Sequence, residues 1–321
     1  MKRLFASLTA CAMIPAAAAH AATAYISNER GNSISVVDLD RGVEIAQWPV
    51  GARPRGITLS RDGRYIYVCV SNEHSVKIID RATGRILKEL PSGEDPEQFF
   101  LSRDGATLFV ANENDAALTA IDLASGTVAF QVAVGGEPEG VTQSPDGKMV
   151  VVTSEEDNRL SWIDLSSRAE AATTETDIRP RHVEFTKDGK ELWVAAEIAG
   201  TVQIVDTMSK AVIQTLNFSI DGVAAHKILP CGIAFTPDGQ TAIVALGRAD
   251  HIALVDVATR KVRGYVPVGR RVWHLAISAD GQRAYTANGL SDNVSVVDLS
   301  TGKVTQTIGI GAGPWGIVVA P

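Results

Sequence analysis

Hydrophobic residues in this chain occur in short runs, and residues 55–93 hold one complete example of the pattern. Four runs rich in β-branched and aromatic residues fall at 56–60, 65–70, 75–80 and 84–90. Asp62-Gly63 separates the first two runs and Arg81 to Gly84 the last two; Asp bonds its own following backbone there and Gly takes a positive φ without steric cost. The stretch predicts a four-stranded antiparallel meander, with strands a, b, c and d in chain order.

Two turn markers show that this unit is repeated. The a–b turn recurs as Asp-Gly at 62, 104, 146, 188, 238 and 280, with spacings of 42, 42, 42, 50 and 42. The Asp that ends strand c recurs at 38, 80, 122, 164, 206, 256 and 298, in the same register. One meander would expose two apolar faces, so it must stack on its copies, and four strands in about 40 residues is typical of propeller blades.

The chain ends explain why seven c-strand markers accompany only six a–b turns. Residues 316–320 align with a strand a, after which the chain stops, and residues 24–28 align with the end of a strand b. A C-terminal strand a that joins N-terminal strands b, c and d would complete the seventh blade and remove two open sheet edges. We therefore predict an all-β fold, a seven-bladed β-propeller of four-stranded antiparallel blades with the ring closed in this way.

The first 22 residues differ from the repeats and predict a cleaved signal peptide. Lys2 and Arg3 precede an apolar segment, and Ala19-His20-Ala21 fits a small-x-small cleavage site. The alternative, lipid modification at Cys11, would follow an apolar segment of only about seven residues. We expect a periplasmic, monomeric propeller over residues 23–321, with no run of the ~20 apolar residues that a membrane span needs.

Charge and cysteine content narrow the class of partner. Without Lys2 and Arg3 the chain has 28 basic and 37 acidic residues, a net charge of −9, which argues against nucleic acid. Cys69 and Cys231 lie in blades four repeats apart, too distant for a disulfide across the ring.

Candidate functional residues gather where each strand a begins. In a meander ring the d–a and b–c connections share one face, here called the loop face, and the a–b and c–d turns share the other, here called the turn face. The loop face is the variable one, and variable loops on a rigid scaffold are the usual site of binding. Around the ring, the first side chain after the strand-a opening is Arg55, Glu97, Glu139, Arg181, Cys231, Trp273 and Trp315. The next residue around the ring is Gly56, Gln98, Gly140, His182, Gly232, His274 and Gly316.

These positions predict a ligand pocket at the channel mouth on the loop face. Convergent Arg, Trp and His suit an anionic, planar or metal-bearing ligand. Eight extra residues between Asp206 and Asp238 form a longer loop on the same face, which contains His226 and could cover the mouth. The predicted ligand-binding residues are Arg55, Arg181, His182, Trp273, His274, Trp315, Glu97, Glu139 and His226. His182, His226 and His274 with a nearby Glu are also candidate metal ligands, although their spacing forms no local motif.

The repeats resemble the YVTN family of bacterial β-propellers. The resemblance rests on Tyr65-Ile66-Tyr67-Val68, Val296-Val297-Asp298 with Thr301-Gly302, and the strand-a openings at 53–57 and 313–317, and it extends from about residue 24 to the end. The seven repeats and the signal peptide are similar to the subgroup described as PQQ-dependent catabolism-associated β-propeller proteins. That resemblance implies a periplasmic accessory protein beside PQQ-dependent alcohol oxidation, with a dehydrogenase or a transport component as partner.

The sequence is compatible with three functions. The first is a non-catalytic binding or scaffold propeller accessory to PQQ-dependent alcohol catabolism. The second is a metal-dependent, lactonase-like hydrolase, and the third is a propeller that binds a redox cofactor. PQQ and a metal ion are the candidate cofactors, and whether the chain is an enzyme is left open.

Overall fold

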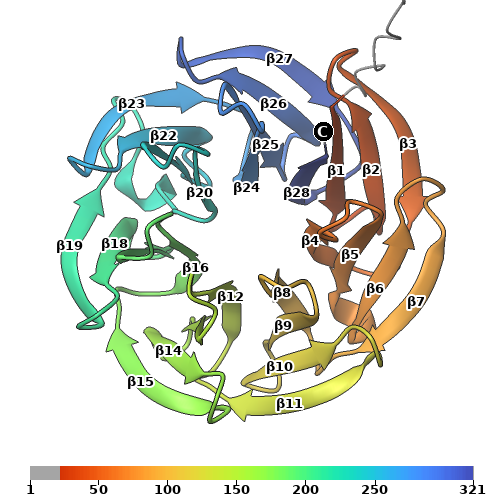
Figure 1. Cartoon of the computed structure of the whole chain (residues 1–321). Coiled ribbons are helices and arrows are strands. Elements are labelled where there is room, and N and C mark those ends of the chain that lie inside the picture. The colour runs from red at the N-terminus through yellow and green to blue at the C-terminus, as the bar shows by residue number, and fades with distance from the viewer. Residues whose placement is uncertain (1–21, 321) are drawn as a thin grey trace, which may run out of the picture.

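The computed structural model describes residues 22–320 and has seven four-stranded antiparallel sheets arranged in a ring. Figure 1 shows the ring along its axis, with the innermost strand of each blade around a central channel. The predicted seven-bladed propeller is confirmed. The predicted signal peptide lies outside the described residues apart from Ala22, and so do the candidate cleavage site and Cys11.

The strands follow the repeat closely. The closing blade, from the channel outward, is β28 (Pro314–Ala320), β1 (Thr23–Asn28), β2 (Ser33–Asp38) and β3 (Val43–Pro49). The next two blades are β4 (Pro54–Leu59), β5 (Tyr65–Val70), β6 (Ser75–Asp80), β7 (Ile86–Pro91), and β8 (Pro96–Leu101), β9 (Thr107–Asn112), β10 (Ala117–Asp122), β11 (Thr127–Ala133). Two more are β12 (Pro138–Gln143), β13 (Met149–Ser154), β14 (Arg159–Asp164), β15 (Ala169–Glu175), and β16 (Pro180–Phe185), β17 (Glu191–Ala196), β18 (Thr201–Asp206), β19 (Ala211–Asn217). The last two are β20 (Ile233–Phe235), β21 (Thr241–Ala245), β22 (His251–Asp256), β23 (Lys261–Pro267), and β24 (Val272–Ile277), β25 (Arg283–Asn288), β26 (Asn293–Asp298), β27 (Lys303–Gly309).

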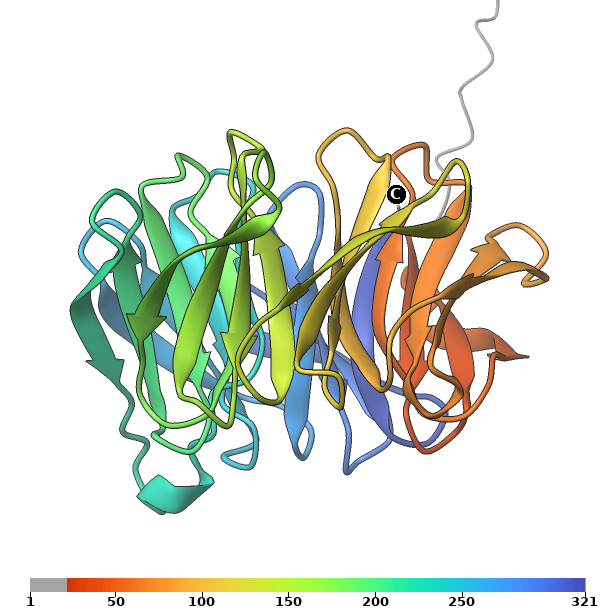
Figure 2. The same cartoon turned by 90° about the horizontal axis from the view of Figure 1, so that it is seen from below.

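Two short 3-10 helices complete the described elements. η1 (Ser71–Glu73) lies in a b–c connection, and η2 (Ala225–Lys227) lies in the long connection between β19 and β20. In Figure 2 the C-terminus lies at the top with the turn face, and η2 projects from the opposite, loop face. None of the described helices is long and apolar enough to cross a membrane.

Repeated Asp hydrogen bonds form the turns. At an a–b turn, Asp62 Oδ1 accepts from the Arg64 N–H at 3.1 Å and from the Ser60 hydroxyl at 2.6 Å, and Gly63 has a φ of 68°. At a c–d turn, Asp80 Oδ1 accepts from the Thr83 N–H at 2.9 Å. The turn chemistry expected from the sequence is therefore confirmed. Strand d begins at Ile86 rather than at 84, because Gly84 completes the turn with a φ of 71°.

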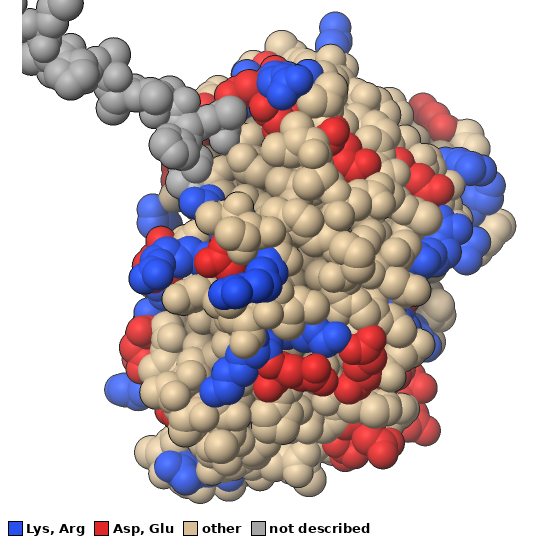
Figure 3. Space-filling view, turned by 90° about the vertical axis from the view of Figure 1, so that its right-hand side faces the viewer, with Lys and Arg blue, Asp and Glu red and all other residues tan. Residues whose placement is uncertain are grey.

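The core lies between the blades. Trp162 and Phe185, from adjacent blades, pack edge to face with ring centres 6.2 Å apart, and Trp193 packs on Phe235 in the same way at 5.4 Å. Figure 3 views the side of the ring, where acidic and basic side chains are mixed and the basic ones form no continuous stripe among the described residues. Apolar contacts between blades therefore stabilise the ring. Because the core lies between the blades, polar side chains can line the central channel.

Ring closure by the two ends of the chain is confirmed. β28 pairs antiparallel with β1, with Ala320 opposite Thr23 and Ile317 opposite Ile26. Trp315 and Ile317 of β28 are 1% and 8% exposed.

Deleting residues 316–321 should lower the melting temperature by about 10 °C, because loss of a buried Ile and opening of the ring edge cost several kcal/mol in a domain of this size. Differential scanning calorimetry tests this. As a control, residues 314–320 can be moved ahead of Thr23 through an a–b turn copied from residues 278–282. This permuted chain should recover the melting temperature, and an unchanged melting temperature in the simple deletion would contradict the closure.

The turn aspartates predict acid sensitivity. Hydrogen bonds from neighbouring hydroxyl and backbone N–H groups lower the pKa of twelve of them: Asp62, Asp80, Asp104, Asp122, Asp146, Asp164, Asp188, Asp206, Asp238, Asp256, Asp280 and Asp298. A lowered folded pKa stabilises the fold above the unfolded value of 3.8, and this contribution is lost as the pH falls through the folded pKa. Urea unfolding between pH 2.5 and 6 should show stability falling toward acid, with a shallower fall when Asp62, Asp104 and Asp146 are changed to Asn. An identical pH dependence in that triple variant would contradict the assignment.

Candidate functional site

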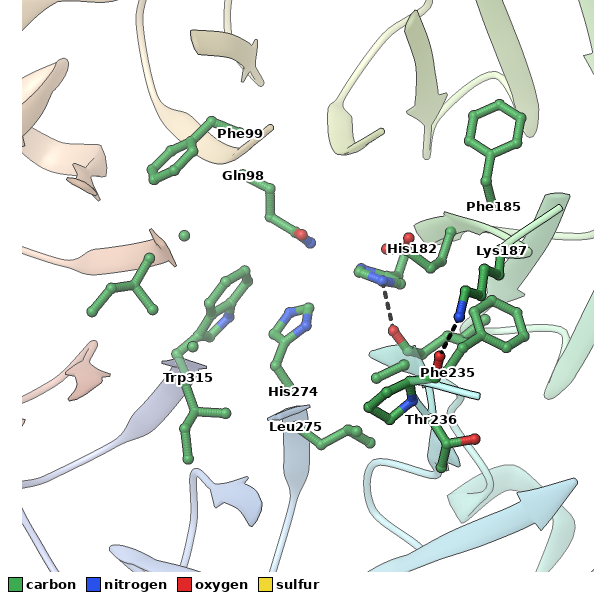
Figure 4. Close-up of a pocket in the computed structure, with 18 residues that line it drawn as sticks. Gln98, Phe99, His182, Phe185, Lys187, Phe235, Thr236, His274, Leu275 and Trp315 are labelled. Atoms are coloured by element: carbon green, nitrogen blue, oxygen red, sulfur yellow. Dashed lines mark hydrogen bonds between the residues drawn. The ribbon is translucent and has the colours of Figure 1, made fainter. Parts of the chain in front are cut away.

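A cavity of about 560 Å³ occupies the central channel, within the size range of small-molecule sites. Its walls come from the innermost strands of six blades: β4, β8, β16, β20, β24 and β28. The lining continues as far as Lys187 and Pro237, beside the a–b turns, so the cavity extends toward the turn face. Figure 4 shows Gln98, His182, His274 and Trp315 grouped around the middle of the cavity, with Lys187 and Thr236 to their right.

The end of the cavity nearer the loop face is here called the inner end. Its shape is set by the second residue after each strand-a opening. Around the ring this position is Gly56, Gln98, Gly140, His182, Gly232, His274 and Gly316, so glycine alternates with a polar residue. A Cβ at Gly140 would lie 2.8 Å from the Arg181 carbonyl oxygen, and one at Gly316 would lie 2.8 Å from the Arg55 carbonyl oxygen. Because real Cβ atoms do not approach backbone this closely, glycine is required where neighbouring strands come together. The three polar side chains, here called the polar collar, are Gln98, His182 and His274.

β-Bulges direct these residues. In six blades the pairing of strands a and b shifts within the first four residues of strand a, as between Pro96 and Phe99 and between Val272 and Leu275. The shift frees Gln98 and His274 from regular pairing, and bulges commonly re-aim side chains beside functional sites. Side chains of strand b satisfy the freed backbone, since the Gly140 N–H donates to Thr153 Oγ1 at 2.7 Å.

Four polar atoms in this part of the channel are buried without a hydrogen-bond partner among the described residues. They are Gln98 Nε2, His182 Nδ1, His274 Nε2 and Trp315 Nε1. Gln98, His274 and Trp315 are 9%, 8% and 1% exposed, and all four residues line the cavity. Buried polar groups are almost always paired with protein or ordered water, so four such atoms on one cavity mark it as a place where water or a polar ligand group binds.

The two histidines are neutral. His182 Nε2 lies 3.1 Å from the Ile233 carbonyl oxygen; that oxygen only accepts, so Nε2 carries the proton and Nδ1 keeps a free lone pair. Burial lowers the pKa of His182 to about 4, and burial with the nearby His182 lowers the pKa of His274 well below its usual value. Their ring centres are 5.5 Å apart.

Glu184 adds an acid–base group to the same cavity. It follows His182 by two residues on β16, which places both on the same side of the strand. Burial raises the pKa of Glu184 to about 7, outweighing the attraction of Arg103. A carboxyl group that titrates near neutral pH is suited to general acid–base catalysis.

Two tryptophan rings lie between His274 of the cavity wall and the arginines nearer the loop face. Trp315 lies 4.3 Å from His274 and 6.4 Å from Trp273, between ring centres. On the other side, the Arg55 guanidinium lies 5.4 Å from the Trp315 ring and Arg181 lies 5.4 Å from the Trp273 ring. The rings and guanidinium groups therefore form one stack toward the loop face.

The arginines above this layer are already paired with carboxylates. Arg181 contacts Glu139 at 2.7 Å, Glu155 at 3.1 Å and Glu197 at 2.8 Å. Burial and the neighbouring Glu139 carboxylate raise the pKa of Glu155.

The same pairing continues around the channel. Arg55 contacts Glu29 at 2.8 Å and also pairs with Glu97, while Arg271 contacts Glu197 at 2.6 Å. These residues, with those paired to Arg181, are here called the arginine–glutamate network. Their mutual contacts occupy the donors of Arg55 and Arg181, whereas Arg271 Nη1 is buried without a hydrogen-bond partner among the described residues.

The structure brings most of the predicted site residues together. Arg55, Arg181, His182, Trp273, His274 and Trp315 form the continuous stack described above, and Glu97 and Glu139 belong to the arginine–glutamate network. The prediction placed the pocket at the mouth on the loop face, whereas the cavity lies one layer deeper. Sequence reasoning did not single out Gln98 or Glu184, although the alternation His182-x-Glu184 is a usable signal.

His226 lies apart from this group. It is exposed on η2, on the predicted face, but it does not line the cavity. Phe218 and Ile228 anchor the inserted loop in the core between two blades.

The metal-ligand alternative has one geometric candidate among the described residues, and it is not the histidine set. Asp95, Glu97 and Glu113 have carboxylate oxygens within 4.8 Å of one another. Arg53 contacts Asp95 at 2.6 Å and Glu97 at 3.2 Å, so arginine already balances much of this charge. Arginine side chains therefore occupy part of the carboxylate oxygens that a cation at this cluster would use.

The raised pKa of Glu184 should appear as a pH-dependent stability change. Between the unfolded value of 4.5 and about 7, the unfolded chain loses the proton while the folded chain keeps it, so ionisation destabilises the fold as pH rises. Glu184→Gln cannot ionise. The difference between its melting temperature and that of the unmodified chain should become more positive from pH 5 to pH 8.5. For Glu89→Gln, on an exposed outer strand, this difference should stay constant. A pH-independent difference for Glu184→Gln would contradict the raised pKa.

Solved structures from other proteins share this fold at low sequence identity. One from Bacteroides fragilis NCTC 9343, provisionally assigned as a 6-phosphogluconolactonase, has 17% identity and a TM-score of 0.80 over 95% of this chain and 99% of that chain. A similarly assigned protein from Bacteroides uniformis ATCC 8492 has 20% identity and a TM-score of 0.77 over 94% and 100%. Hydrazine synthase of Kuenenia stuttgartiensis has 20% identity and a TM-score of 0.73 over 83% and 95%. At these identities the likeness shows the fold alone.

Family comparison is more specific. No curated protein matches the sequence. Residues 7–132 are similar to the family described as outer membrane protein assembly factor BamB. The comparisons do not confirm the resemblance to the YVTN family or the PQQ-related assignment. Both stay predictions, and so does the periplasmic location. Residues 140–313, more than half of the chain, match the family described as lactonase, 7-bladed beta-propeller, and the chain belongs to that family.

Proposed function

We propose that this chain hydrolyses a lactone in the channel cavity. The observation that carries the proposal is the convergence of four unpartnered, buried polar atoms on one cavity that also contains Glu184. Membership of the lactonase family supports the same reaction class.

The polar atoms match the groups of a lactone. Gln98 Nε2 and Trp315 Nε1 are hydrogen-bond donors, which suit the carbonyl oxygen. His182 Nδ1 is an acceptor, which suits a ring hydroxyl. The Trp315 ring offers a flat apolar surface for the carbon skeleton.

The proposed reaction is general-base hydrolysis. The Glu184 carboxylate removes a proton from water as the water oxygen bonds to the lactone carbonyl carbon. The carbonyl π bond opens to an oxyanion, which accepts hydrogen bonds from Gln98 and Trp315. When the carbonyl re-forms, the bond to the ring oxygen breaks and that oxygen takes the proton from Glu184. The product is an open-chain hydroxy acid, and Glu184 is again a carboxylate.

This scheme places the ligand below the arginines rather than on them. The prediction of a planar anion held by Arg55 and Arg181 needs free guanidinium groups, whereas both are paired with glutamates. We therefore favour lactone hydrolysis over binding of PQQ and over an accessory role without catalysis.

The test is hydrolysis of glucono-1,5-lactone by the purified chain, followed by pH-stat after subtraction of the uncatalysed rate. We expect kcat/KM to rise with pH through about 7, because Glu184 must be ionised to act as base. Glu184→Gln should lower kcat by about 100-fold or more, the range of a lost general base. Glu89→Gln is the matched control and should retain full activity. The proposal is wrong if neither glucono-1,5-lactone nor its 6-phosphate is hydrolysed above background, or if Glu184→Gln remains fully active.

A further inference from the structure

We infer that the cavity selects uncharged lactones and rejects those that carry a phosphate or another anionic group. This inference rests on the proposed function and names its substrate class. It separates the chain from the two proteins provisionally assigned as 6-phosphogluconolactonases, with which the structural likeness shows only the fold.

The charges that line the cavity support it first. Its titratable lining residues are His182, Glu184, Lys187 and His274. The histidines contribute no positive charge at neutral pH, because burial holds their pKa values low. One acid and one base remain, so the cavity has no excess positive charge to balance a phosphate dianion.

Lys187 is poorly placed to bind a phosphate at the inner end. It is exposed, it follows Glu184 by three residues toward the turn face, and its Nζ donates to the Pro237 carbonyl oxygen at 2.8 Å. Figure 4 shows the Lys187 side chain to the right of His182, next to Thr236 and farther from Gln98 and His274, and its contact with Pro237 holds it beside the a–b turns. Phosphate sites normally combine several positively charged or backbone donors, and a single exposed ammonium group does not supply them.

The arginines are close but belong to a different environment. Arg55 and Arg181 do not line the cavity, and the rings of Trp315 and Trp273 lie against their guanidinium groups. An anionic group at the inner end would therefore contact indole, imidazole and amide groups rather than a guanidinium group, and it would share the cavity with the Glu184 carboxylate. The charges of Arg55 and Arg181 act on His274, but both arginines are paired with glutamates. An uncharged hydroxyl at the same place can pair with Gln98, His182 or His274 without any charge penalty.

Two measurements test the inference. In the first, kcat/KM is compared for glucono-1,5-lactone and 6-phosphoglucono-1,5-lactone at pH 7. We expect at least a 100-fold preference for the uncharged lactone. An equal rate, or a faster rate with the phosphate, overturns the substrate class while it leaves lactone hydrolysis intact.

In the second, titration calorimetry compares binding of glucono-1,5-lactam, which resists hydrolysis, with its 6-phosphate. The uncharged lactam should bind at least tenfold more tightly, and Glu184→Gln should narrow this preference, because the variant removes the repelling charge. Glu89→Gln should leave the preference unchanged. Tighter binding of the phosphate, no binding of either lactam, or a preference that Glu184→Gln does not alter each contradicts the inference. Binding without hydrolysis would refute the proposed function and leave the selectivity standing.

Discussion

The close approach of neighbouring innermost strands is the constraint on which the channel depends. Seven blades can meet around a narrow axis only if some strand positions have no Cβ, and Gly140 and Gly316 show how little space is left. The same spacing leaves room for larger side chains in the blades between them, so a packing requirement of the scaffold produces the polar collar of Gln98, His182 and His274. Structure and binding site thus share one cause.

Division of the channel by aromatic rings is the second organising feature. On the loop side, Arg181 and Arg271 are held by buried glutamates, which replace the water that these charges lose. On the cavity side, the nearest groups are neutral imidazoles and an indole N–H. Trp315 touches both environments, with a guanidinium group on one side and His274 on the other. The rings therefore keep strong charges close to the cavity without making them part of its walls.

The fold could be derived almost completely from the sequence, because the turn signals are local. Asp62 and Gly63 bond and bend within a few residues, so their spacing reports the blade repeat directly. The grouping of Arg55, Trp315 and His274 also followed from the register of the repeat. The depth of the cavity could not be derived from the sequence, because it depends on which side chains pair with one another across the ring. Arg55 forms ion pairs with glutamates, and nothing in the local sequence determines this pairing. Glu184 was missed for a related reason, since its importance lies in burial by other blades.

The alternation of glycine and polar residues has a consequence for the shape of the site. Seven is an odd number, so an alternating ring cannot close without a defect, and here Gly316 and Gly56 stand side by side where the first and last innermost strands meet. The collar therefore has a gap on one side, flanked by Trp315, and side chains on the other. This gap breaks the near-sevenfold rotational symmetry of the channel, so the two sides of a bound molecule meet different surroundings. An odd blade count therefore gives the site a preferred direction around the channel axis.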